Sequence, residues 1–204
     1  MLGKLVAGLH PLRAEPFRCS HGLFERAEGV RGPRALLITC SDLGADPHTL
    51  IPTNPEGVYV LQNAGNLVPP HAGEGADGRV CAVSAAIELY DVKDVVVCGH
   101  SPCGVMDALL GAAGDETCLA RGGLDPVART RAIMREHYRQ LEGEPLRDAL
   151  AGENVLVQLE NLLTIPAVEW GLVRGDLRLH GWVLKGGRIY AYGPHAGEFV
   201  PLAR

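Results

Sequence analysis

Residues 95–104 read VVVCGHSPCG. The first four form a continuous apolar run rich in branched aliphatic side chains, which is typical of a parallel strand buried on both faces. His100 and Cys103 follow, three residues apart, and Gly104 opens a helical pattern that extends to Leu110. The stretch therefore predicts a buried strand that ends in a turn carrying two side chains able to bind a metal ion.

Four further apolar runs predict strands. The run before Gly186-Gly187 alternates and is followed by a second run, so this pair predicts an antiparallel hairpin at the edge of the sheet. The four runs are Ala35–Thr39, Val58–Leu61, Leu177–Val183 and Ile189–Tyr192.

Helical patterns fill the intervals between these strands. Asn154 is a candidate N-cap for the last helix, Pro166 is expected to end or kink it, and Pro126 suits the first turn of the helix before it. The predicted helices are Arg79–Leu89, Gly104–Leu110, Asp125–Leu141 and Asn154–Trp170. Strands that alternate with helices predict an α/β fold with a mainly parallel central sheet flanked by helices and an antiparallel C-terminal edge hairpin. We expect one domain over residues 1–204, with residues 1–23 as an N-terminal extension.

The composition narrows the classes of partner. The chain has 204 residues and a net charge of −5 with no basic cluster, which argues against nucleic acid. No apolar run approaches the roughly 18–20 residues of a membrane span. The apolar stretch near the N-terminus is too short, and too interrupted by polar residues and proline, for a secretory signal. We therefore expect a cytoplasmic protein. The six cysteines are then expected to be thiols, most of them buried as small hydrophobic side chains.

Cys40 follows the predicted strand 35–39 as His100 and Cys103 follow the strand 95–98. Active sites of parallel α/β sheets gather at the carboxyl ends of strands, so these three side chains can converge if the strands are neighbours. Thiolate and imidazole are preferred ligands of zinc, and three of them leave a fourth position for water. Asp42 could reach the metal or its water. The alternative is that both cysteines are structural and that His100 caps a helix.

The chain resembles the β-class carbonic anhydrases from about Phe24 to Tyr192. The family has C-x-D-x-R after its first strand and H-x-x-C-G after a V-V-C-G strand. The matching segments here are Cys40–Gly44, His100–Gly104, Gln62–Pro70 (QNAGNLVPP), Asn154–Leu162 and Leu179–Trp182.

The resemblance implies a zinc enzyme that hydrates carbon dioxide to bicarbonate by zinc-bound hydroxide. It implies Cys40, His100 and Cys103 as the metal ligands and Asp42 as a catalytic residue that orients the water. It further implies substrate contacts at Gly44, Asn66 and Gly104, a small-molecule substrate, and a homodimer or larger homo-oligomer.

Two positions depart from the family pattern. Gly44 stands where the family has the Arg that pairs with the Asp, which leaves Asp42 freer to become a fourth zinc ligand. Arg31 stands where the family often has an active-site Gln. It either pairs with Asp42 or an anionic substrate, or it is a solvated loop residue. His48 and His71 are candidate proton shuttles or plain surface histidines.

These departures keep other functions open. The same zinc site could hydrolyse carbonyl sulfide, carbon disulfide or a larger molecule, since Gly44 leaves room where an Arg side chain would lie. A second class is a non-catalytic zinc protein whose metal site Asp42 closes.

Overall fold

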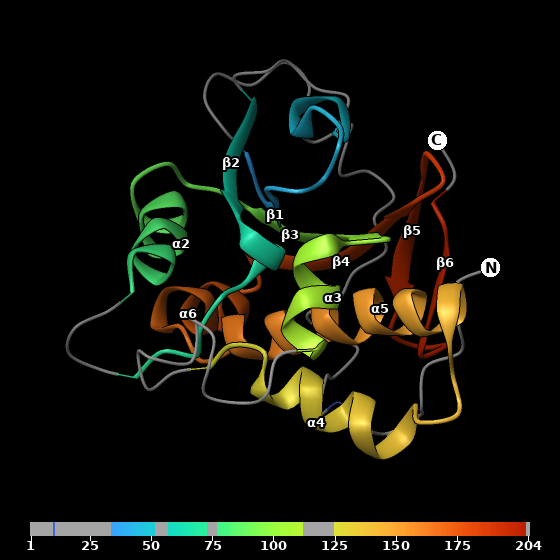
Figure 1. The fold of residues 1–204 in the computed structure, drawn as a ribbon. Coiled ribbons are helices and arrows are strands. Elements are labelled where there is room, and N and C mark those ends of the chain that lie inside the picture. The colour runs from blue at the N-terminus through green and yellow to red at the C-terminus, as the bar shows by residue number, and fades with distance from the viewer. Residues whose placement is uncertain (1–9, 11–33, 52–56, 73–76, 112–124, 203–204) are drawn as a thin grey trace.

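The computed structural model describes residue 10 and residues 34–51, 57–72, 77–111 and 125–202. Within them, six strands form one sheet in the order β2-β1-β3-β4-β5-β6 (Figure 1). The strands are β1 (Ala35–Cys40), β2 (Val58–Asn63), β3 (Asp94–Ser101), β4 (Arg178–Lys185), β5 (Arg188–Gly193) and β6 (Glu198–Pro201).

The direction of pairing changes at β4. Strand β1 pairs in parallel with both β2 and β3, and β3 pairs in parallel with β4. Strands β5 and β6 then add in antiparallel fashion. The expected fold class, a mainly parallel sheet with an antiparallel C-terminal edge, is confirmed. Strand β6 was not predicted, because four residues ending in Pro201 carry little periodicity.

The described helices lie between the parallel strands along the chain. They are α2 (Gly78–Glu88), α3 (Gly104–Gly111), α4 (Ala128–His137), α5 (Gly143–Leu162) and α6 (Pro166–Val173), with the short 3-10 helices η1 (Pro47–Thr49) and η3 (Ala64–Asn66). The predicted helix over Asn154–Trp170 is wrong at its beginning, whereas the expected interruption at Pro166 is confirmed. Helix α5 begins at Gly143, so Asn154 lies inside it and is no N-cap. The chain then breaks, and Pro166 starts α6 in its first turn, where its missing N–H costs nothing.

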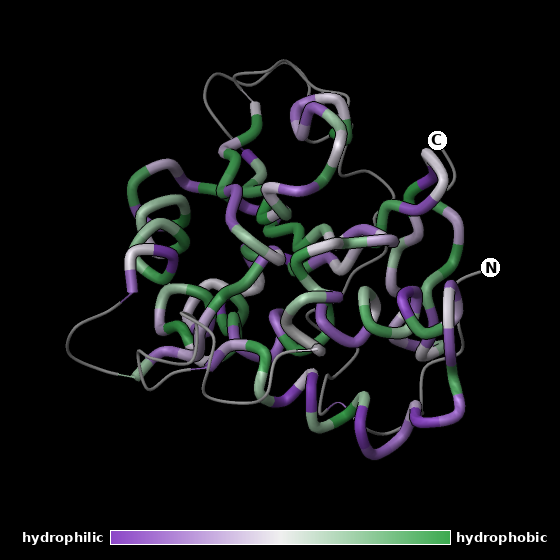
Figure 2. The backbone as a smooth tube through the Cα atoms, in the orientation of Figure 1, coloured by the Kyte–Doolittle hydropathy of each residue, from purple (hydrophilic) through white to green (hydrophobic). Residues whose placement is uncertain are grey.

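Helix α4 is shorter than the predicted Asp125–Leu141. The Asp125 carboxylate accepts a hydrogen bond from the N–H of Val127 at 3.0 Å, so residues 125–127 form a turn before the helix. Many residues of α4 are hydrophilic, whereas hydrophobic residues are frequent in the central strands (Figure 2). None of the helices in the described part of the chain combines the length and apolarity that crossing a membrane requires.

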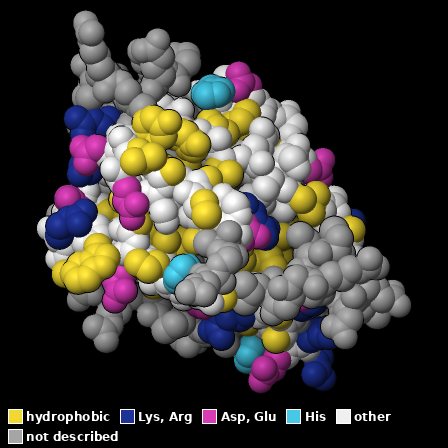
Figure 3. Space-filling view, turned by 90° about the vertical axis from the view of Figure 1, so that its left-hand side faces the viewer, with side chains coloured by type: hydrophobic (Ala, Val, Ile, Leu, Met, Phe, Trp, Pro, Cys, Tyr) yellow, Lys and Arg dark blue, Asp and Glu magenta, His cyan; other side chains and the backbone are white. Residues whose placement is uncertain are grey.

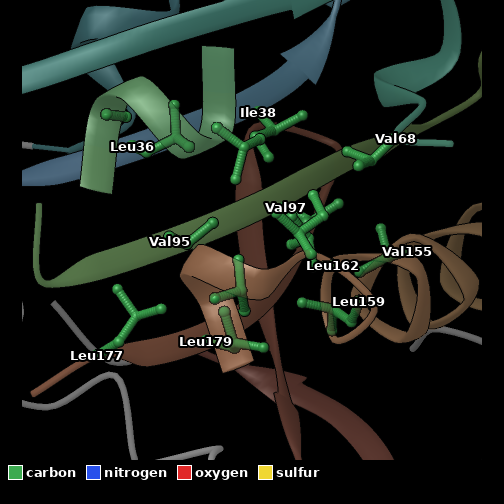
Figure 4. Close-up of a cluster of buried hydrophobic side chains, with 14 of the residues drawn as sticks. Leu36, Ile38, Val68, Val95, Val97, Val155, Leu159, Leu162, Leu177 and Leu179 are labelled. Atoms are coloured by element: carbon green, nitrogen blue, oxygen red, sulfur yellow. The ribbon is translucent and has the colours of Figure 1, made fainter. Parts of the chain in front are cut away.

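Alternate residues of the central strands pack on opposite faces of the sheet. Leu36 and Ile38 of β1 join Val95 and Val97 of β3 in a core under α2, α5 and α6 (Figure 4). Their neighbours Leu37, Val96 and Trp182 face the other side, where Leu43, Leu50 and Ile51 cover them. Both faces of these strands are therefore buried, which is why their sequences are continuous apolar runs.

Helix α5 approaches the sheet closely over two glycines in adjacent strands. A Cβ at Gly99 of β3 would lie 2.9 Å from Val155 Cγ2, and a Cβ at Gly181 of β4 would lie 2.9 Å from Leu159 Cδ1. Real Cβ atoms essentially never come this close to another side chain. These two glycines therefore set the distance between α5 and the strands that carry the candidate site.

Candidate metal centre

Three side chains converge where β1 and β3 end. Cys40 is the last residue of β1, and His100 and Cys103 lie at and just after the end of β3, which pairs with β1 in parallel. One ligand atom from each of the three lies within 4.8 Å of the others, and all three residues are buried. The two sulfur atoms are 3.7 Å apart. The structure thus brings together the three residues for which the sequence predicts zinc binding, and the ion itself remains a prediction.

The donor atoms of this cluster suit a zinc ion. Nε2 of His100 is buried and has no hydrogen-bond partner among the described residues. A buried polar nitrogen without a partner is costly, and coordination to a metal removes that cost. Two sulfur donors and one imidazole nitrogen are a set that zinc prefers over magnesium or calcium, which favour oxygen ligands.

The surroundings of Cys40 favour a thiolate. Its Sγ accepts hydrogen bonds from the backbone N–H of Gly65 at 3.2 Å and of Asp42 at 3.3 Å. The contact with the Cys103 thiol, supported by these two amides, lowers the pKa of Cys40 well below the ordinary value of a thiol, although burial opposes this. The same contact, together with burial, raises the pKa of Cys103. Without a metal ion, the pair is therefore expected to share one proton between two sulfur atoms.

Asp42 does not belong to the cluster of ligand atoms. Its Oδ2 accepts a hydrogen bond of 2.9 Å from the N–H of Gly104, the first residue of α3. A carboxylate at a helix N-terminus is stabilised by the unpaired N–H groups there. The backbone of Gly104, which we expected to contact substrate, thus holds Asp42 in this structure.

The other predicted site residues fall into different surroundings. Gly44 has φ +69°, and no heavy atom lies within 4 Å of where its Cβ would be. Asn66 is buried with φ +50°, and its Nδ2 has no hydrogen-bond partner in the described part of the chain. Arg31 lies outside the described residues. His48 is exposed in η1.

His71 lies away from the three clustered ligands. It lines a surface pocket of about 420 Å³ between α2 and α6, together with Cys81, Ser84 and Pro166 among others. Figure 3 views the molecule from this side, on which hydrophobic side chains reach the surface. Leu89, which lines the pocket, is exposed, as are Trp170 and Val173 of α6. The pocket contains none of the candidate metal ligands.

Two sets of polar residues on α5 were missed by the sequence reasoning. Ser101, next to His100, donates to Asp148 Oδ1 at 2.6 Å, and Lys185 donates to Asp148 Oδ2 at 2.5 Å. Asn154 and Gln158 are both buried and contact the segment around Gly65. Asn154, Gln158 and Asn161 follow one another at helical spacing in a stretch whose other residues, apart from Glu160, are apolar. This signal could have identified them as one polar face.

The comparisons with known proteins agree with this geometry. The family model described as "Carbonic anhydrase" matches residues 35–188. A carbonic anhydrase of Synechocystis is 36% identical over 201 residues, covering 97% of this chain and 73% of the relative. A carbonic anhydrase of Pseudomonas aeruginosa is 36% identical over 202 residues, covering 98% and 91%.

A solved structure extends the likeness to three dimensions. The β-carbonic anhydrase CcaA superposes with a TM-score of 0.77 at 35% sequence identity, covering 91% of this chain and 84% of that one. The fold, the cluster at the ends of β1 and β3, and these relatives together establish that the chain belongs to the β-carbonic anhydrase family.

Proposed function

We propose that this protein is a zinc-dependent carbonic anhydrase that catalyses the reversible hydration of carbon dioxide to bicarbonate. The observation that carries the proposal is the cluster of Cys40, His100 and Cys103, whose ligand atoms lie within 4.8 Å of one another in a member of this family. These three residues would hold the ion. When bound, zinc supplies a nucleophile at neutral pH because it lowers the pKa of a coordinated water molecule.

The residues around the cluster have separate tasks in this proposal. The amides of Gly65 and Asp42 stabilise the negative charge on Cys40 Sγ. The Asp42 carboxylate is the group that we assign to orient the reacting water through a hydrogen bond. The N–H of Gly104 donates to Oδ2 of that carboxylate and holds it in place. Asp42 thus has a hydrogen-bond partner although Gly44 provides no side chain to pair with it. Arg31 stays a candidate for a second partner.

Stopped-flow hydration of carbon dioxide tests the proposal, combined with measurement of the metal content. We expect one zinc per chain, hydration far above the uncatalysed rate, loss of activity when a chelator removes the metal, and recovery when zinc is restored. A protein that holds one zinc and does not hydrate carbon dioxide would contradict the proposal. Assays with carbonyl sulfide and carbon disulfide on the same sample would then separate a related hydrolase from a non-catalytic zinc protein.

We also propose that the chain forms a homodimer or a larger homo-oligomer and that it works in the cytoplasm. The first rests on the family resemblance and the second on the N-terminal sequence pattern described above. Analytical ultracentrifugation of the purified protein tests the first, and fractionation of the source cells tests the second.

A further inference from the structure

We infer that Asn154 is a positioning residue for the zinc ligand Cys40, acting through the backbone of Gly65. The inference rests on the proposed zinc site. The Nδ2 group of Asn154 donates to the carbonyl of Gly65 at 3.0 Å, and the N–H of the same Gly65 donates to Cys40 Sγ at 3.2 Å. One glycine is thus held on its carbonyl side by α5 and contacts the metal ligand on its amide side.

Gly65 is suited to this place by its backbone and by its surroundings. Its φ of +74° lies in the left-handed region that favours glycine. A Cβ there would lie 2.3 Å from Met106 Cε. The segment therefore passes close to α3 and to Cys40 without a side chain between them. The direction of its N–H then depends on what holds the peptide groups of the segment.

The side chain of Asn154 can hold the carbonyl of Gly65, in the peptide group that follows this N–H, because its own orientation is fixed. It is only 1% exposed. Its Oδ1 accepts hydrogen bonds from Gln158 Nε2 at 3.0 Å and from Thr130 Oγ1 at 3.4 Å. With both acceptor contacts on the oxygen, the amide nitrogen faces the carbonyl of Gly65. A rotated side chain would place its amide nitrogen against the Nε2 donor of Gln158 and its oxygen against the carbonyl of Gly65, which is unfavourable in a buried site.

The same face of α5 also holds the end of this segment. Gln158 Oε1 accepts from the N–H of Val68 at 2.8 Å, and Asn161 Nδ2 donates to the carbonyl of Val68 at 2.8 Å. Asn161 is therefore a natural comparison for Asn154. Each donates one side-chain hydrogen bond from α5 to a backbone carbonyl of the segment, but only Asn154 contacts the residue that donates to Cys40.

In addition to the hydrogen bond from the N–H of Asp42, Cys40 Sγ thus accepts a second hydrogen bond, from the N–H of Gly65, whose position the fold determines. An N–H that points at a coordinating sulfur withdraws charge from it and restricts its position. Partners of this kind outside the ligand set typically change metal affinity by about 10- to 100-fold. We therefore expect Asn154 to act on the strength of zinc binding and on the electronic state of Cys40 Sγ, rather than on fold stability alone.

The experiment compares Asn154→Ala with Asn161→Ala in the full-length protein. Zinc affinity is measured by competition with a chromogenic chelator, and the sulfur-to-metal charge-transfer band is recorded after loading with cobalt. We expect Asn154→Ala to weaken zinc binding by about 10- to 100-fold and to shift this band. Asn161→Ala should leave both within about threefold of the parent, although it removes a hydrogen bond from the same segment.

Equal zinc affinities and identical cobalt spectra for the two variants would overturn the inference while leaving the proposed function intact. A parent protein that binds no zinc would overturn both. If Asn154→Ala does not fold, Asn154→Asp replaces it, because the carboxylate still accepts from Gln158 and Thr130. The parent loaded with cadmium-113 gives a further measurement that needs no variant. A scalar coupling between the metal and the amide proton of Gly65 supports the hydrogen bond to Cys40, and its absence contradicts it.

Discussion

The carboxylate of Asp42 is hydrogen-bonded to the first N–H of α3, at Gly104, with Oδ2 and N 2.9 Å apart. This contact ties the turn after β1 to the turn after β3, and Cys40 and Cys103 are themselves close neighbours of the two residues. The carboxylate of Asp42 is thus anchored to the backbone and stands outside the cluster of ligand atoms. This arrangement favours a metal site with three protein ligands, and it can be tested directly.

Replacing Asp42 by Asn separates an orienting role from a ligand role. If Asp42 orients the reacting water, Asp42→Asn should lower kcat/KM for carbon dioxide hydration by about 100-fold and leave one zinc per chain. The physical reason is that the amide keeps an acceptor for Gly104 but loses the negative charge. Stopped-flow kinetics and metal analysis on the same preparation measure both quantities. Weaker zinc binding in this variant, by tenfold or more, would instead mark Asp42 as a ligand.

A guanidinium at position 44 should increase turnover. Gly44→Arg places a cation two residues beyond Asp42, where no heavy atom lies within 4 Å of the new Cβ. We expect a higher hydration rate than in the parent, together with a loss of about 1–2 kcal/mol in the free energy of unfolding, because φ is +69°. Gly44→Met is the matched control, since it carries the same backbone strain without the charge. A parent that already turns over rapidly, with no gain in Gly44→Arg, would show that this site needs no arginine.

Removing a candidate ligand should weaken zinc binding strongly. Cys103→Ser replaces a soft sulfur by a hydroxyl oxygen, so we expect zinc affinity to fall by more than the roughly 100-fold that groups outside the ligand set produce. Hydration activity should fall with it. Cys81→Ser is the control, because Cys81 is exposed and lies on α2. Full zinc content in Cys103→Ser would show that the cluster at the ends of β1 and β3 is not the metal site.

His10 should make the stability of the protein depend on pH. Its ring nitrogens contact Glu153 at 2.5 Å and Glu160 at 2.6 Å. Although burial disfavours the charged ring, the hydrogen bonds to these carboxylates raise the pKa of His10 to about 9 from an ordinary value of 6.5. Tyr138 also contacts Glu153, and Arg129 contacts Glu160, so the imidazolium is one of several groups that compensate the acids.

The sign of this effect follows from the raised pKa. The contribution of His10 is fully present below pH 6.5 and is lost as the pH rises through about 9, with an upper limit of roughly 3 kcal/mol. Urea unfolding of the parent and of His10→Gln at pH 6 and pH 9.5 measures it. The difference in unfolding free energy between them should shrink at the higher pH, while an exposed control, His48→Gln, should show no such change. A difference that stays constant with pH would contradict the prediction.

The strands that carry the candidate ligands could be predicted because both faces of each are buried. Residues 36–38 of β1 and residues 95–97 of β3 are unbroken runs of branched aliphatic side chains, and the chemistry-bearing residues follow toward the ends of these strands. Parallel pairing then brings Cys40 beside His100 and Cys103. These features depend on local sequence and on one general property of parallel sheets, so they are visible without coordinates.

The bounds of the helices were harder to predict because they depend on contacts with other segments of the chain. The first turns of α5 contain Gly143 and Pro145, which hide its beginning, and buried polar residues such as Glu153 and Asn154 interrupt its apolar pattern. Those polar residues are buried because other segments supply their partners, among them Gly65 and His10. No sequence period reveals such contacts, and for the same reason the hydrogen bond from Gly104 to Asp42 was not foreseen.

The glycines beneath α5 connect the candidate metal centre to the packing in the middle of the sheet. A methyl group at position 181 would press against Leu159 and Val155 and act as a wedge between helix and strands. Any lifting of α5 would carry Asn154 with it and turn the amide of Gly65 away from Cys40. A substitution that touches neither ligand nor solvent could therefore be detected as weaker retention of zinc. The substitutions that this protein tolerates would then be limited by the spacing between α5 and the sheet as much as by the residues of the candidate metal site.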